Sequence, residues 1–343
     1  MKKNTVLIIS IAILALLIGF AQILPKGTIL DRLKINNKST LKKELSDFAV
    51  KDIENIDKIF IADKSNHSVV LEKKGKIWRV NNKFNAREDA IDNLMEAIKN
   101  LRVRQPISKA EYETQIKRLA TTGRKVEIYK NGELFKTYYV GGATQDQMGT
   151  YMILDNSRVP FIMELPGFTG FLTPRYFPME SLWRENFIFK SNPKNIRLIS
   201  VKNNEDTQKS FTLKKTVSTY HLFDYQNKEI QNIDSLQVKR YLSYFKKISY
   251  EALAVNMKEA KKDSLLKSNA YQIIHIETND GKQQTIKTYR VLNDAGITND
   301  DGELLKYDPD RTYGFFNNLK EVATIQYRTL DKIAVAPSFF IKE

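Results

Sequence analysis

The sequence contains no cysteine, and this absence excludes several kinds of site at once. Without thiols the chain can have no disulfide framework, no thiolate nucleophile and no cysteine-ligated metal. It also lacks the acylated cysteine that anchors bacterial lipoproteins, so any membrane anchor must be an apolar segment. Glycine (14) and proline (9) are sparse among 343 residues, and 42% of residues are hydrophobic. This composition is typical of packed globular domains rather than fibrous or disordered chains.

Histidine is almost as rare, and the motifs of common enzymes are missing. The three histidines, His67, His221 and His275, are far apart and show no HExxH or HxH spacing. No Gly-x-Ser-x-Gly elbow, Walker loop or GxGxxG sequence is present. We therefore predict no metal, no cofactor and no enzymatic activity. A Ser-His-Asp triad assembled from distant residues is the one arrangement that spacing alone leaves open.

Negative charge is also in deficit, because 55 Lys and Arg face 40 Asp and Glu and give a formal net charge of +15. A basic balance suggests nucleic acid or an anionic membrane surface as a partner. The lysines, however, alternate with acidic residues, as between Glu44 and Lys58, and no arginine-rich arm occurs. The sequence thus predicts no nucleic-acid binding.

One long apolar run stands at the start of the chain. Residues 6–24 are interrupted only by Ser10 and Gln22, and Pro25 and Gly27 follow them. At 1.5 Å per residue, 19 residues make a helix of about 28 Å, close to the roughly 30 Å hydrocarbon thickness of a bilayer. We predict a transmembrane anchor at residues 6–24, with a cytoplasmic tail at residues 1–5.

A cleaved signal peptide is the alternative interpretation of this run. Lys2 and Lys3 would form its basic region, and Gly19 and Ala21 would flank its cleavage site. The run is longer than a usual signal core and continues past that site, which favours an uncleaved anchor. Under both interpretations the remaining chain is exported. The predicted location is the cytoplasmic (inner) membrane, single-pass, with the bulk of the chain on the extracytoplasmic or periplasmic side.

After a polar linker at residues 25–47, the chain shows the same order of elements twice. We predict an α+β repeat at residues 48–180 and a second at residues 181–343, each an antiparallel sheet with helices on one face. In the first, strands are expected at 56–61, 69–72, 77–80, 126–129 and 134–140, and helices at 87–101 and 109–119. In the second, strands are expected at 196–199, 211–214, 220–223, 273–277 and 285–291, and helices at 233–248 and 257–267.

The two copies also end alike. Tyr176–Leu182 stands 151 residues before Tyr327–Ile333, and Asp155–Arg158 resembles Asp308–Arg311. These matches predict that both pairs occupy equivalent positions in the repeats.

Two segments are candidates for partner binding. Residues 141–150 start with a glycine pair, which predicts either a flexible strand connection with positive φ or a mobile binding loop. Residues 160–177 are rich in aromatics, glycine and proline, which predicts a core between the repeats or, if exposed, an apolar docking patch. The candidate residues are Gly141, Gly142, Gly149, Tyr151, Phe161, Phe168 and Phe171.

Four segments follow the pattern of a known family: Ile77-Trp78-Arg79-Val80, the helix with Leu94, Ile98 and Leu101, Tyr139–Gly142 with Gly149–Met152, and a strand at Arg158–Phe161. In these segments the sequence resembles a bacterial family catalogued as domain of unknown function 4340. The resemblance covers roughly residues 48–330. The second copy departs from it, with Tyr220 at the place of Trp78 and no double glycine. The family is similar to exported parts of auxiliary subunits of ABC-type transporters, including those linked to gliding motility, and the resemblance implies no catalytic residues.

These observations predict a non-enzymatic envelope protein that acts as an accessory or scaffold subunit of a transport, secretion or motility assembly. Its partners would be the membrane, through residues 6–24, and other proteins of an envelope complex. The alternative is a periplasmic ligand-binding module that uses the cleft between the two repeats.

Overall fold

The computed structural model describes residues 46–217 and 219–342. By its contacts the chain divides into Met1–Asp47 and Phe48–Glu343. The predicted cytoplasmic tail, the apolar run at residues 6–24 and nearly all of the linker lie outside the described residues. Among the helices that are described, none combines the length and the hydrophobicity needed to cross a bilayer.

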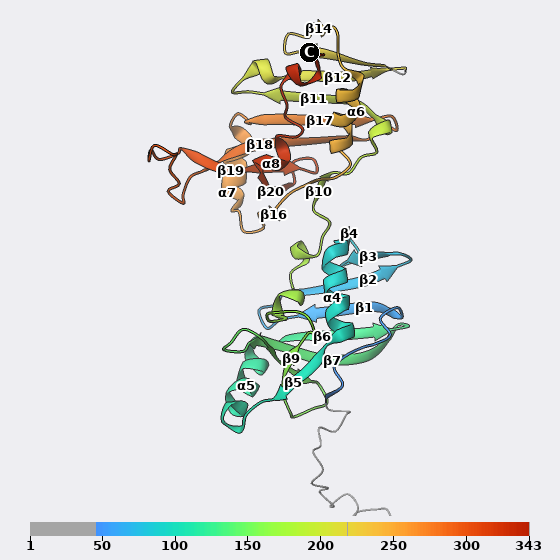
Figure 1. Cartoon of the computed structure of the whole chain (residues 1–343), viewed down its shortest axis with the longest axis vertical. Coiled ribbons are helices and arrows are strands. Elements are labelled where there is room, and N and C mark those ends of the chain that lie inside the picture. Colours follow the sequence, from blue (N-terminus) through green and yellow to red (C-terminus); the bar gives the residue numbers. More distant parts are fainter. Residues whose placement is uncertain (1–45, 218, 343) are drawn as a thin grey trace, which may run out of the picture. The chain divides into compact units, whose positions relative to one another are not determined.

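The first copy of the predicted repeat is one antiparallel sheet of nine strands (Figure 1). Its strands are β1 (Ile56–Ala62), β2 (Ser68–Lys74), β3 (Ile77–Val80), β4 (Phe84–Asn85), β5 (Arg102–Pro106), β6 (Arg124–Lys130), β7 (Glu133–Ala143), β8 (Thr150–Leu154) and β9 (Phe161–Glu164). They lie side by side in the order β4-β3-β2-β1-β6-β7-β8-β9-β5. The sheet is therefore two meanders joined at β1 and β6.

Two helices carry the chain between these meanders. Helix α4 (Glu88–Asn100) connects β4 at one edge of the sheet with β5 at the other. Its apolar residues recur every three or four positions, so Ile91, Leu94 and Ile98 share one buried face. Helix α5 (Lys109–Thr122) then returns the chain to β6 in the middle of the sheet.

The second copy repeats this plan strand for strand. Its elements are β11 (Ile196–Asn203), β12 (Phe211–Thr216), β13 (Thr219–Asp224), β14 (Glu229–Ile230), α6 (Ser235–Tyr244), β16 (Ala252–Leu253), α7 (Glu259–Lys267), β17 (Gln272–Thr278), β18 (Gln283–Leu292), β19 (Tyr307–Phe316), β20 (Glu321–Gln326) and α8 (Tyr327–Leu330). The strand order β14-β13-β12-β11-β17-β18-β19-β20-β16 is the order of the first sheet. A separate two-stranded sheet pairs β10 (Phe187–Phe189) with β15 (Ile248–Ser249).

The residue pairing between the central strands, including its irregularities, is the same in both copies. Ile59 pairs with Ile128 in the first sheet and Ile199 with Ile276 in the second, and all four side chains are buried. The register also shifts just after the first residue of β1 and just after the first residue of β11. This agreement confirms that the chain contains two similar sheet units.

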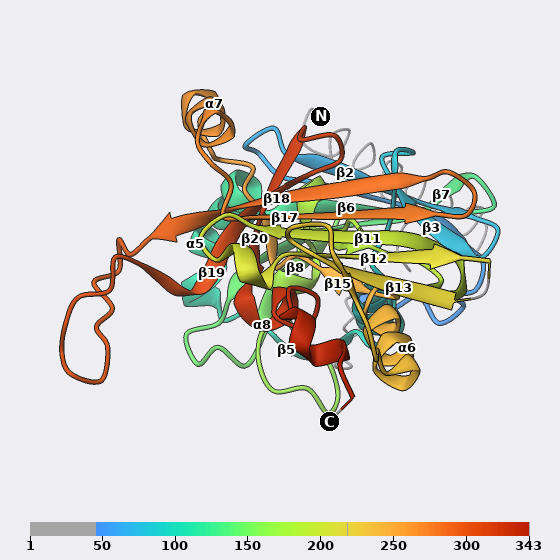
Figure 2. The same ribbon diagram turned by 90° about the horizontal axis from the view of Figure 1, so that it is seen from above.

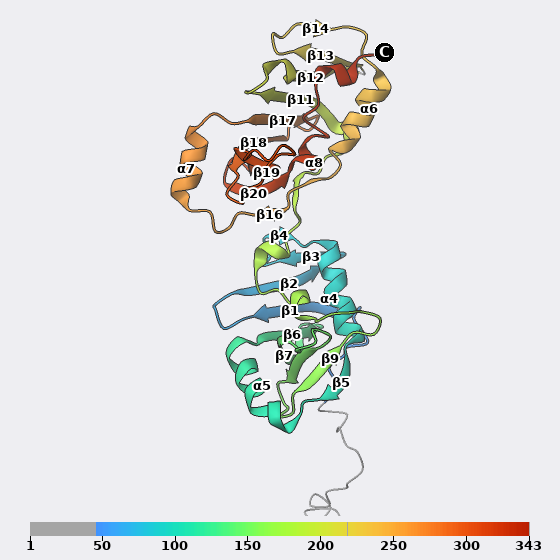
Figure 3. The ribbon, with the colours of Figure 1, turned by 60° about the vertical axis from the view of Figure 1, so that its left-hand side comes forward.

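The prediction that the helices lie on one face of each sheet is wrong. Helix α4 covers one face of the first sheet and α5 the other, and α6 and α7 do the same in the second (Figure 3). The reason is that alternate residues of a strand point to opposite faces. Val140 points into the main core, whereas its neighbour Gly141 meets Leu119 of α5.

The two copies do not match at every predicted place. Asp155–Arg158 follows β8, whereas Asp308–Arg311 lies inside β19, so their predicted equivalence is wrong. Val140 and Thr288 are equivalent residues, and they pair with Met152 and Gly314 respectively. Thr150, two residues before Met152, is therefore equivalent to Thr312, two residues before Gly314. Tyr176–Leu182 and Tyr327–Ile333 both follow the last strand of the meander in their copy.

The β1–β6 pairing gives a stability prediction. Replacing the buried Ile128 by alanine should lower the free energy of unfolding by about 2–5 kcal/mol, because it leaves a cavity in the core. Ile77→Ala is the matched control, since that side chain is 53% exposed. Urea unfolding of the full chain measures both. Equal midpoints for the two variants would show that the β1–β6 junction is not a stabilising centre.

Candidate functional site

Three of the predicted site residues, Gly141, Gly149 and Tyr151, meet where β7 passes into β8. The connection is a loop of six residues, Thr144–Gly149, which we call the β7–β8 loop. Its ends are joined by a hydrogen bond from the Thr144 N–H to the Gly149 carbonyl (2.9 Å). The expected positive φ occurs in this connection at Gln147 (φ 56°) and not at its glycines.

Glycine is required at this corner because other groups approach closely. A Cβ on Gly141 would lie 2.9 Å from Leu119 Cδ2 and 2.9 Å from the carbonyl oxygen of Tyr151. A Cβ on Gly149 would lie 2.5 Å from Ile162 Cγ2. Gly142 differs from both, since nothing lies within 4 Å of the Cβ position there.

The start of α5 places an acidic side chain against the same corner. Ser108 caps the helix, and its Oγ accepts a hydrogen bond from the Glu111 N–H (3.3 Å). The Glu111 carboxylate accepts a hydrogen bond from the Ser108 hydroxyl (3.0 Å), whereas in a capping box it would accept from the Ser108 backbone N–H. Its other oxygen accepts from the Tyr151 hydroxyl (3.3 Å). Burial, and after it the Glu111 carboxylate, raises the pKa of Tyr151.

Asp146 is the polar centre of the β7–β8 loop. Its Oδ1 accepts hydrogen bonds from the Thr144 hydroxyl (2.5 Å) and the Met148 N–H (3.0 Å), and Arg104 of β5 lies 3.1 Å from its Oδ2. The Thr144 hydrogen bond, followed by the Met148 N–H and Arg104, lowers the pKa of Asp146 to about 2. The carboxylate is therefore ionised throughout the physiological pH range, and the loop is held in one conformation around it.

A shallow pocket of about 360 Å³ opens beside this loop. Arg104, Glu111, Asp146 and Tyr151 contribute its polar groups, and Ile162 contributes apolar surface. Met148, two residues after Asp146 in the same loop, has a side chain that is 45% exposed. The corner thus combines a fixed negative charge, a fixed positive charge and an accessible thioether, which is a set of groups suited to recognition.

The aromatic candidates do not form a common surface. Phe161 is buried (1% exposed) in the core of the first copy, and so are Leu172 and Tyr176. The predicted aromatic segment therefore belongs to the first copy's own core and not to a core between the repeats. Phe171 is half-buried, and only Phe168 is exposed (40%), with the Arg175 guanidinium 4.7 Å from its ring centre.

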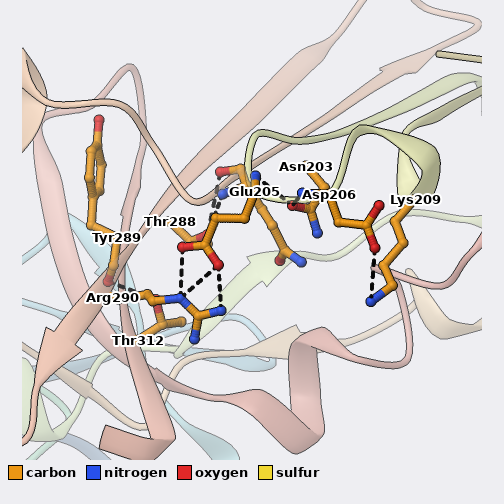
Figure 4. Close-up of polar contacts among 9 residues, drawn as sticks. Asn203, Glu205, Asp206, Lys209, Thr288, Tyr289, Arg290 and Thr312 are labelled. Carbon is orange, nitrogen blue, oxygen red and sulfur yellow. Dashed lines mark hydrogen bonds and ion pairs between the residues drawn. The ribbon is translucent and has the colours of Figure 1, made fainter. Parts of the chain in front are cut away.

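The second copy has a different chemistry at the equivalent corner (Figure 4). Its ladder places Tyr289 and Arg290 where the first copy has Gly141 and Gly142. Arg290 forms a bidentate pair with Glu205, with Nε–Oε1 and Nη2–Oε2 distances of 2.9 Å and 2.7 Å. Glu205 itself is positioned by the side chain of Asn203, which accepts its N–H (3.0 Å).

Aromatic rings complete this second corner. The Arg290 guanidinium lies 4.0 Å from the Tyr271 ring centre and 5.3 Å from that of Tyr307. The Glu205 carboxylate, which accepts its hydrogen bonds, raises the pKa of Arg290. The position of Gly142, which has open space around it in the first copy, is thus occupied in the second copy by a paired arginine. The two copies therefore differ in chemistry at this corner.

A larger pocket of about 490 Å³ lies between α4 and the β2–β3 hairpin. Trp78, Ile91 and Met95 give it apolar walls. Both signs of charge surround these walls, from Lys73, Lys76, Lys190, Glu54, Glu88, Asp92 and Glu185. The main-chain carbonyl of Trp78 accepts a hydrogen bond from the Ala86 N–H (2.8 Å), which positions the Trp78 backbone. As expected from the sequence, Tyr220 occupies the position of Trp78 in the second copy.

Titratable groups that commonly bind metals are dispersed. Among residues 46–217 and 219–342, no group of three His, Asp or Glu side chains could hold a metal ion. His67 lies 2.9 Å from Asp63, His221 lies 2.6 Å from Glu229, and His275 bonds to Thr285 (2.7 Å).

Comparison with known families gives one match. The profile of the Domain of unknown function (DUF4340) matches residues 78–269, which is more than half of the chain. The chain belongs to this family. The match begins at Trp78 in β3 and ends just before β17, so it spans parts of both structural copies. A search of curated proteins found no match, and a search of solved structures found none either.

Sequence reasoning found the glycines and Tyr151 but missed the charged residues of the corner. Glu111 carried a readable signal, because Ser108-x-x-Glu111 is a capping-box pattern at the start of a helix. Arg104 and Asp146 carried none. They meet only because β5 adds to the sheet beside β9, a pairing between strands some 60 residues apart.

The two adjacent glycines give a matched pair of substitutions. Gly141→Ala should lower the free energy of unfolding by about 1–3 kcal/mol, because the new methyl group overlaps Leu119 and a backbone carbonyl. Gly142→Ala should change it by no more than about 0.5 kcal/mol, since its surroundings are open. Thermal unfolding compares the two. A destabilisation of equal size in both variants would contradict the close approach at Gly141.

Proposed function

We propose that this protein is a non-enzymatic, membrane-anchored envelope protein that acts as an accessory or scaffold subunit of a transport, secretion or motility assembly. In this proposal the apolar run at residues 6–24 fixes it in the cytoplasmic membrane. The two sheet units lie on the extracytoplasmic side, where the β7–β8 loop of the first unit binds a protein partner.

The observation that carries the proposal is the chemistry of the β7–β8 loop. A general acid or base works best with a pKa near the operating pH. In this pocket the pKa values move away from the operating pH. That of Asp146 is lowered to about 2, and that of Tyr151 is raised above its usual value near 10. Charges that stay fixed and are held by several hydrogen bonds favour recognition of a partner over proton transfer.

The duplication supports a scaffold in a second way. The two copies share one backbone fold but differ at surface positions. Nothing lies within 4 Å of the Cβ position of Gly142 in the first copy, whereas the equivalent Arg290 of the second copy is paired with Glu205. A duplicated fold whose surfaces have diverged can offer different contacts from one rigid support. Because loops held by a rigid sheet commonly carry binding functions, we assign partner recognition to the first copy.

Site-specific photocrosslinking in membranes tests the proposal. A photoreactive amino acid in place of Met148 should give one major adduct with an envelope protein, because that side chain is exposed on the β7–β8 loop, whose Thr144 and Asp146 line the pocket. Leu304 is the matched control position, since it is 69% exposed in the corresponding β18–β19 connection of the second copy. Gly142→Arg, which introduces the residue of the second copy, should abolish the adduct at position 148 while leaving the fold unchanged.

Either of two results would contradict the proposal. No protein adduct at position 148, or adducts of equal yield at positions 148 and 304, would contradict partner recognition by this loop.

A second candidate function rests on the pocket beside Trp78. Its volume of about 490 Å³ falls within the roughly 300–1,000 Å³ of small-molecule sites, and it combines an aromatic wall with charges of both signs. These features favour a small zwitterionic ligand. In this alternative the protein is a periplasmic ligand-binding module, and its ligand would bind against the first copy.

A further inference from the structure

We propose that the β6–β7 hairpin of the first copy is a second membrane contact, whose tip enters the interfacial region of the bilayer. The tip consists of Tyr129, Leu134 and Phe135, which flank the Asn131-Gly132 turn. This inference rests on the proposed anchoring by residues 6–24 and adds to it a contact made by the folded body.

The tip exposes two adjacent apolar side chains. Leu134 and Phe135 are 56% and 52% exposed, and the ladder shifts register here, so that Phe135 is the extra residue of a bulge. The turn is rigid, because Asn131 and Gly132 both have the positive φ of a tight hairpin turn. The Gly132 N–H also donates a hydrogen bond to Asp57 (2.6 Å). Two adjacent large apolar side chains held in water by a rigid turn are typical of an insertion element.

Lysines surround the aromatic rings of the tip. The Lys58 ammonium lies 3.7 Å from the centre of the Tyr129 ring, and that of Lys130 lies 4.2 Å from the centre of the Phe135 ring. Long lysine side chains can place their methylene groups against apolar surface and their charge among lipid headgroups. Aromatic residues with such neighbours are common where a protein meets the membrane–water interface.

Carboxylates are also present, and two of them are already hydrogen-bonded. Asp57 accepts from the Gly132 N–H, and Asp52 accepts from Asn55 (2.7 Å) with Lys130 at 3.5 Å. Glu133 is exposed at the turn. Burial of apolar surface therefore drives the proposed contact, and the lysines add attraction to anionic headgroups.

The hairpin lies at the end of the sheet where the folded body begins (Figure 1). Ile56, the first residue of β1, pairs with Lys130, and the Lys136 ammonium donates to the carbonyl of Ala49 (3.0 Å). Only 23 residues, 25–47, separate the apolar run from this point. In any conformation they span at most about 80 Å. A segment of this length allows the hairpin end of the first copy to reach the bilayer.

The second copy provides an internal comparison. Its equivalent hairpin joins β17 to β18 through Asn279-Asp280-Gly281 and continues with Lys282 and Gln283. By the strand pairing, Gln283 stands where the first copy has Leu134, because Gln283 pairs with Glu277 and Leu134 with the equivalent Tyr129. Phe135 is the extra residue of a bulge in β7 and has no counterpart in the second hairpin. Figure 2 shows both hairpins, β6–β7 and β17–β18. The backbone plan therefore does not require apolar residues at the tip. They occur only in the copy that follows the apolar run.

A fluorescent label on the full chain tests the inference in vesicles of phosphatidylcholine and phosphatidylglycerol. Since the sequence has no cysteine, Glu133→Cys gives one labelling site beside intact Leu134 and Phe135. An environment-sensitive dye at position 133 should shift its emission to the blue, and nitroxide-bearing lipids should quench it. Lys282→Cys is the matched control at the second hairpin, and its dye should show neither effect. Adding Leu134→Ser and Phe135→Ser should remove the shift at position 133.

Three other outcomes would overturn the inference, and they can be told apart. Protein that floats with the vesicles while its dye at position 133 remains in water keeps the anchoring and rejects the hairpin contact. A shift that disappears when the protein is diluted in the bilayer identifies a second copy of this chain as the occupant. Protein that does not float with the vesicles contradicts the anchoring itself and, with it, the hairpin contact. Unchanged unfolding of the Leu134→Ser and Phe135→Ser variant excludes loss of folding as the cause of a lost shift.

Discussion

Each sheet depends on one pairing between strands that are distant in the sequence. Ile59 of β1 lies against Ile128 of β6, and Ile199 of β11 against Ile276 of β17, at the middle of their sheets. All four side chains are fully buried. Without this junction each copy would be two separate meanders with exposed edges. The crossover helices follow from it, because the chain must travel from one edge of the sheet to the other and back before β6 can join β1.

This shared junction leaves the outer positions free to diverge. At the β7–β8 corner, the first copy has Gly141 and Gly142, whereas the second copy has Tyr289 and Arg290, and Arg290 forms an ion pair and contacts aromatic rings. At the central hairpin, Gln283 of the second copy replaces Leu134, and the bulge residue Phe135 has no counterpart. Both exposed features, the pocket and the apolar tip, belong to the first copy. We propose that the first copy makes the contacts of the protein, while the second copy keeps the fold with different residues at these two places.

Much of this fold could be predicted because local patterns encode it. The helix around Ile91 and Leu94 follows from apolar periodicity, and the hairpin at Asn131-Gly132 follows from its turn residues, both of which are local. Strand β5 was missed because it is short, largely exposed and without alternation. The site was predicted only in part. Gly141 was singled out as a residue of a flexible or binding loop, and its role in binding stays a prediction. Its need for glycine arises from contact with Leu119, a residue that only the folded sheet brings near.

The central claim is that the first copy alone makes the contacts of this protein at the membrane. Hydrogen–deuterium exchange of the full chain, compared between native membranes and detergent, tests it most directly. The account predicts slower exchange in membranes at residues 129–135 and 144–149, with no change at the equivalent segments 277–283 and 293–306 of the second copy. Equal protection of both copies, or protection of neither, would contradict it.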